Sequence, residues 1–79
     1  MATYELWEMR SGNLVGSWAA EADALAVIRT ALDTHGDETV ATMSLLAEDA
    51  RGVTNVVAEG PALIERARQR TPSQDKLSA

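Results

Sequence analysis

The first apolar segments of the chain have the character of β-strands. Residues 3–9 (TYELWEM) combine β-branched and aromatic side chains with polar ones, and this mixture favours the pleated conformation. The sequence SGN at 11–13 is typical of a turn, and apolar positions resume at 14–18 (LVGSW). We therefore expect a β-hairpin that carries both tryptophans of the chain, Trp7 and Trp18.

From Glu21 to His35 the apolar positions change to a helical period. One stripe of this segment carries Ala22, Leu25, Ile28 and Leu32, with Ala24 and Ala31 beside it. The other side carries Asp23, Thr30, Asp33 and Thr34, so the predicted helix is amphipathic. Gly36 predicts its end, because glycine adopts the left-handed conformation at little cost.

The second half of the chain repeats this order of elements. Residues 39–47 (TVATMSLLA) predict a third strand, 48–52 (EDARG) a turn and 53–58 (VTNVVA) a fourth strand. Gly60 and Pro61 predict the start of a second helix, because the first helical turn does not need the N–H that proline lacks.

This second helix is expected to run to about Arg70 and to bury Leu63, Ile64 and Ala67. Pro72 prevents its continuation, and the residues of 71–79 are mostly small and polar. We expect one α+β domain over residues 1–70 and a disordered C-terminal tail over 71–79.

The predicted fold is ββαββα: a four-stranded antiparallel sheet with two helices packed mainly on one face. A shift of 39 positions sets the first half on the second, and the aligned pairs are Leu14 on Val53, Trp18 on Val57, Ala24 on Leu63, Leu25 on Ile64, Ile28 on Ala67 and Arg29 on Arg68. The pattern fits a duplicated ββα unit. The alternative is the chance similarity of two hairpin–helix units of equal length.

Each predicted strand places apolar side chains on both faces of the sheet. Successive side chains of a strand point to opposite faces, and the adjacent apolar pairs are Leu6–Trp7, Leu14–Val15, Val40–Ala41, Leu45–Leu46 and Val56–Val57. With both helices on one face, the other face would expose apolar surface, which usually marks a contact site. The alternatives are helices divided between the faces, or dilution of the open face by polar residues such as Glu8, Ser17, Thr42 and Ser44.

The faces of the two indoles depend on the register of the first hairpin. A two-residue turn at Gly12 and Asn13 sets Trp7 opposite Trp18, so that both rings share one face. A three-residue loop over 10–12 sets Tyr4 opposite Trp18 and moves Trp7 to the other face. The glycine position slightly favours the two-residue turn.

Composition strengthens the case for a partner. The chain has 79 residues and no cysteine, so its small core has no disulfide support and oligomerisation is the simplest addition. No basic segment with a following apolar run starts the sequence, and no apolar stretch is long enough to cross a bilayer. We therefore expect a cytoplasmic protein that does not contact membranes.

The charge distribution argues against nucleic acid as the main ligand. Residues 1–60 hold ten of the twelve acidic side chains, and the net charge of the chain is −5. Clustered cations supply most of the affinity for phosphate, and the one basic cluster is Arg66, Arg68 and Arg70 in ERARQR. Binding of a nucleic acid or small anion by these arginines is the second hypothesis.

The residue pattern does not favour catalysis or a cofactor. His35 lies in DTHGDE, where adjacent acids at a helix end normally point into solvent and do not converge on a metal. No nucleophile stands in a motif beside this histidine, and the glycines form no phosphate-binding pattern. We expect no metal, no cofactor and no enzymatic activity.

The sequence thus predicts a small protein-interaction or dimerisation module, acting as a regulator or adaptor. The expected partner is a second copy of the chain or another protein, bound on the open face of the sheet. The candidate interface residues are Trp7, Met9, Leu14 and Trp18.

Overall fold

The computed structural model describes residues 2–69 and confirms the α+β class and the ββαββα order. The elements are β1 (Thr3–Glu8), β2 (Asn13–Trp18), α1 (Glu21–His35), α2 (Asp37–Val40), β3 (Met43–Glu48), β4 (Thr54–Glu59) and α3 (Pro61–Arg68). Arg70 and the tail expected at 71–79 lie outside the described residues.

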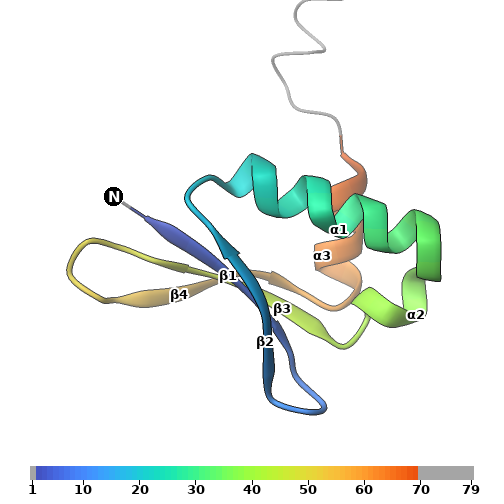
Figure 1. Ribbon diagram of the computed structural model, residues 1–79, viewed down its shortest axis with the longest axis horizontal. Helices are drawn as coiled ribbons and strands as arrows, with labels where there is room; N and C mark the ends of the chain where they lie inside the picture. Colours follow the sequence, from blue (N-terminus) through green and yellow to red (C-terminus); the bar gives the residue numbers. More distant parts are fainter. Residues whose placement is uncertain (1, 70–79) are drawn as a thin grey trace, which may run out of the picture.

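All four strands form one antiparallel sheet in the order β2-β1-β3-β4 (Figure 1). The helices lie together on one side of this sheet and leave its other face open. Each hairpin places its first strand at the centre and its second strand at an edge. The two halves are therefore arranged symmetrically about the junction of β1 and β3.

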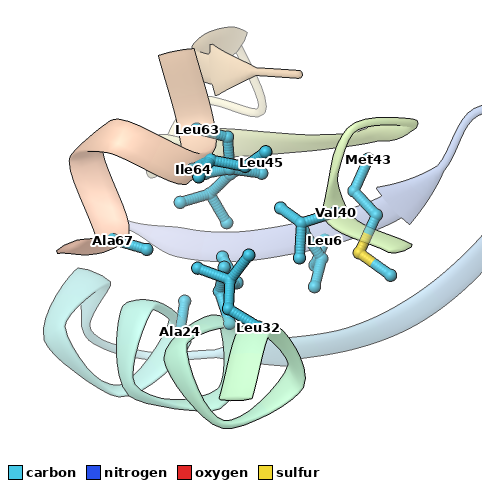
Figure 2. Close-up of a cluster of buried hydrophobic side chains, with 10 residues drawn as sticks. Leu6, Ala24, Leu32, Val40, Met43, Leu45, Leu63, Ile64 and Ala67 are labelled. Carbon is cyan, nitrogen blue, oxygen red and sulfur yellow. The ribbon is translucent and has the colours of Figure 1, made fainter. Parts of the chain in front are cut away.

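The core lies between the sheet and the helices, and both halves contribute to it (Figure 2). Its buried side chains are Leu6 from β1, Met43 and Leu45 from β3, Ala24, Ile28 and Leu32 from α1, Val40 from α2, and Leu63, Ile64 and Ala67 from α3. A shift of 39 positions relates Leu6 to Leu45, Ala24 to Leu63 and Ile28 to Ala67, so equivalent positions of the two halves are buried.

Helix α1 has the predicted bounds but a slightly different buried stripe. Ala24, Ile28 and Leu32 are buried at a spacing of four residues, whereas Ala22 is exposed. Glu21 in the first turn stabilises the positive end of the helix dipole. Gly36 ends the helix at φ 88°, and its N–H donates to the carbonyl of Leu32.

The third strand starts later than the sequence predicts, and the segment before it is helical. Residues 37–40 form α2, a single turn closed by the N–H of Ala41 donating to the carbonyl of Asp37. The side chain of Val40 extends from this turn into the core and is fully buried. Its apolar character is therefore explained by core packing and does not indicate a strand. Strand β3 begins only at Met43.

The prediction of a two-residue turn at Gly12 and Asn13 in the first hairpin was wrong. Tyr4 pairs with Trp18 as the alternative loop predicts, but the register shifts between Leu6 and Trp7, so that Trp7 pairs with Leu14. Val15 is the extra residue of a β-bulge in β2. The two indoles consequently lie on opposite faces of the sheet.

Gly60 joins β4 to α3 in a backbone conformation reserved for glycine. Its φ of 60° and ψ of −136° fall in the mirror image of the β region, and its N–H donates to the carbonyl of Met43. Its own carbonyl accepts from the N–H groups of Leu63 and Ile64. A Cβ at this position would lie 3.3 Å from the carbonyl oxygen of Ala41.

We expect Gly60→Ala to lower the free energy of unfolding by about 2–3 kcal/mol, because a side chain is strained in this backbone region and crowds the carbonyl oxygen of Ala41. Gly12→Ala is the control, since Gly12 also has positive φ (74°) but no neighbour within 4 Å of an added Cβ. It should lose about 1 kcal/mol. Urea unfolding, monitored by circular dichroism, measures both values. Equal losses for the two variants would contradict the close approach of Gly60 to Ala41.

Candidate functional site

The open face of the sheet is the face turned away from the helices. Leu6 and Leu45 point into the core, so their neighbours along β1 and β3 point outward, and cross-strand partners share a face. The residues that point outward are Thr3, Glu5 and Trp7 on β1, Leu14 and Ser17 on β2, Ser44, Leu46 and Glu48 on β3, and Thr54, Val56 and Glu59 on β4.

An apolar stripe crosses this open face and takes one residue from every strand. The stripe consists of Leu14, Trp7, Leu46 and Val56, in the order of the strands. Leu14 lies opposite Trp7 and Val56 lies opposite Leu46. Leu14 is 48% exposed and Val56 57% exposed, while Trp7 and Leu46 are half-buried. Trp7 pairs with Ser44 on β3 and Leu46 pairs with Glu5 on β1, so the two apolar pairs lie in adjacent rows and meet diagonally.

Polar neighbours hold the indole of Trp7 in place on this face. Its Nε1 donates to Oε1 of Glu5 over 3.2 Å, two residues back along the same strand. On the neighbouring strand lies Ser44, which is 1% exposed and donates to Oε2 of Glu59 over 3.3 Å. The ring therefore has its polar atom satisfied and presents its apolar surface.

Three glutamates surround the central part of the stripe. Glu5 lies opposite Leu46 on β1, Glu48 lies two residues further along β3, and Glu59 lies on β4 opposite Ser44. None of the open-face positions described above carries a lysine or arginine. The apolar stripe is therefore bordered by negative charge alone.

Trp18 does not belong to this face, contrary to its predicted role as an interface anchor. It points toward the helices and packs against the buried core. Its ring covers Gly16, where an added Cβ would lie 2.9 Å from Cη2 of the indole. The shifted hairpin register is the reason, because it places Trp18 on the face of Tyr4 and Leu6.

The other predicted interface residues are accessible. Trp7 and Leu14 form one end of the stripe. Met9 is 59% exposed just beyond the end of β1, and its backbone N–H donates to the carbonyl of Thr42. The sequence missed Leu46 and Val56 as members of this site, although each stands in one of the adjacent apolar pairs that predict an apolar surface on both faces.

Two of the arginines predicted for nucleic-acid binding, Arg66 and Arg68, form ion pairs between the helices. Nε of Arg66 donates to Oε2 of Glu21 over 2.5 Å, and both terminal nitrogens of Arg68 donate to the carboxylate of Asp37. These contacts lower the pKa of Asp37 and raise the pKa values of both arginines. Each cation therefore already faces a carboxylate of α1 or α2, while Arg70 lies outside the described residues.

Glu8 fastens the loop of the first hairpin to the start of β3. Oε2 accepts from the hydroxyl of Thr42, and Oε1 accepts from both the N–H and the hydroxyl of Ser11 over 2.8 Å. The hydrogen bond from Thr42, followed by those from Ser11, lowers the pKa of Glu8 to about 2. Glu8 points away from the open face, so it does not dilute the stripe.

Residues 2–69 contain neither a candidate metal site nor a membrane-spanning helix. Between residues 2 and 69, no three His, Asp or Glu side chains are placed to hold a metal ion. None of the helices in that range is both long and apolar enough to span a bilayer. Comparison with protein-family models, curated proteins and solved structures finds no significant match.

We expect the two tryptophans to respond differently to alanine substitution. Trp18→Ala should lower the free energy of unfolding by about 2–3 kcal/mol, because it removes a partly buried ring that packs on the core. Trp7→Ala should cost about 1 kcal/mol or less, since the ring stands on the open face. Chemical unfolding measures both variants, and a larger loss for Trp7→Ala would contradict the assignment of faces.

The carboxylate of Glu8 should make hairpin stability depend on acid pH. Its pKa is about 2 in the folded chain against a usual 4.5, so the stabilisation is complete above pH 4.5 and is lost as pH falls toward 2. The difference in unfolding free energy between the wild type and Glu8→Gln should therefore shrink over this range. Thr42→Val removes the strongest hydrogen bond and should raise the midpoint of the Glu8 carboxyl in an NMR titration.

Proposed function

We propose that this chain is a non-catalytic protein-interaction module, and that the apolar stripe of its open face is the binding surface. The observation that carries the proposal is the set of exposed or half-buried apolar side chains on the open face, one from each strand: Leu14, Trp7, Leu46 and Val56. Soluble domains rarely expose a contiguous apolar patch without a contact function. Tryptophan is also over-represented among residues that dominate binding energy.

The face of the sheet is better suited to binding than its edges. Both edge strands carry a register irregularity, in β2 around Val15 and in β4 around Val57. An extra residue disrupts the regular ladder and twists the strand, which hinders pairing with a strand of another molecule. Association through the stripe needs no backbone pairing.

Nucleic-acid binding, the second hypothesis from the sequence, receives no support from the geometry. Arg66 and Arg68 already neutralise Glu21 and Asp37, so they offer little free positive charge to a phosphate. The open face carries Glu5, Glu48 and Glu59, which would repel one. The interaction module remains the function that the described residues support best.

Site-specific photo-crosslinking tests the proposed surface. A benzophenone amino acid replaces Val56 on the stripe, or Val27 on the outer side of α1, which is exposed to a similar degree at 40%. The chain is incubated with lysate of its source cells and irradiated. We expect discrete adducts from position 56 that an excess of unlabelled chain suppresses, and none from position 27.

A second variant ties the adducts to the stripe. Trp7→Ala in the chain labelled at position 56 should remove the adducts, because the indole is the largest member of the stripe. Equal labelling from positions 27 and 56, or adducts that survive Trp7→Ala and competition, would contradict the proposal. The mass of each adduct also separates a second copy of the chain from a different protein.

A further inference from the structure

We infer that the occupant of the apolar stripe is a basic amphipathic segment of a different protein, and not a second copy of this chain. The inference rests on the proposed function of the open face and adds the chemistry of the partner. It is drawn from the placement of charge around the stripe.

The three open-face glutamates are placed where a docked segment would meet them. Glu5 lies directly opposite Leu46, Glu48 follows it on the same strand, and Glu59 lies one row away on β4. A partner that covers Leu46 therefore brings its flanking side chains close to three carboxylates. Lysine or arginine at these flanks gains ion pairs, whereas an apolar or acidic flank leaves the carboxylates unpaired.

Within residues 2–69, the open face of a second copy has no lysine or arginine to pair with these three glutamates. Two open faces in contact would bring six glutamates together without a cation from either face. Like charges facing each other across an interface are strongly unfavourable. Two further arginines, Arg10 and Arg51, lie in the two hairpin loops and not on the open face. These loops are at opposite ends of the sheet.

The arginines of the helical layer do not pair with the three glutamates of the open face. Arg66 and Arg68 pair with acids of the same layer, and Arg29 donates to the carbonyl of Ala67. The chain as a whole carries a net charge of −5. Its field therefore attracts a basic partner at long range and opposes the approach of another copy.

The length of the stripe fits a short helix. Four strands span three gaps of about 4.8 Å, which gives about 14 Å from Leu14 to Val56 across the sheet. An α-helix covers this distance in about ten residues. Apolar residues at helical spacing would lie on the stripe, and basic residues beside them would reach the glutamates.

Selection from a displayed library of random peptides tests the inference. Peptides of about 12–16 residues, long enough for three helical turns, are selected on the full chain and counter-selected on Trp7→Ala. We expect enriched sequences to combine leucine or aromatic residues with several lysines or arginines. Sedimentation velocity of the free chain over a concentration series is measured in parallel, and the chain should remain monomeric.

Charge variants then test the role of the three open-face glutamates in peptide binding. One variant carries Glu5→Gln, Glu48→Gln and Glu59→Gln on the open face. The control carries Asp33→Asn, Glu38→Gln and Glu65→Gln on exposed helical positions, which changes the net charge equally. Calorimetry with a selected peptide should show a loss of affinity of about tenfold or more for the first variant and less than about twofold for the control.

Each contrary outcome has a separate meaning. Enriched peptides without basic residues, or equal affinity for the two charge variants, would overturn the inference and leave the interaction surface standing. A dimer that Trp7→Ala dissociates would identify a second copy as the occupant, again overturning only the inference. A monomer with no Trp7-dependent peptide would overturn the inference and the proposed function together.

Discussion

The pairing of Leu6 with Leu45 at the centre of the sheet is the contact on which the rest of the structure depends. The two side chains are cross-strand partners from different hairpins, and both are buried. The two halves share one sheet only because β1 and β3 pair here. Ile28 of α1 and Leu63 of α3 belong to the same buried cluster. One layer of helices is therefore concentrated over one face, and no element within residues 2–69 covers the other.

The helical layer and the open face of the sheet differ in how their charges are paired. In the helical layer, arginines of α3 meet acids of α1 and α2, so attraction joins segments that are distant in the sequence. Exposed ion pairs of this type contribute little stability each, but they fix how α3 sits beside its neighbours. On the open face, Glu5, Glu48 and Glu59 have no cation beside them within the described sheet. These three carboxylates place negative charge beside the exposed apolar residues.

The sequence alone could predict the element order, the bounds of α1 and the apolar character of both sheet faces, because these depend on local periodicity. It could not predict the register of the first hairpin, since a β-bulge at Val15 leaves no residue signature. The α2 turn was hidden because Val40 is apolar in either a strand or a buried helical turn. The roles of Arg66 and Arg68 depend on partners 45 and 31 residues away, which no local pattern reveals.

The two indoles lie on opposite faces of the sheet and have different surroundings. Trp18 fills the space above Gly16 and packs on the core, so the hairpin needs a large side chain there. Trp7 lies on the opposite side of the same sheet, away from the helices, and its polar atom is bonded to Glu5. A polar or β-branched residue at this position would be equally compatible with the strand conformation. Trp7 is therefore an aromatic side chain outside the buried core, and its place on the open face fits the proposed contact with another molecule.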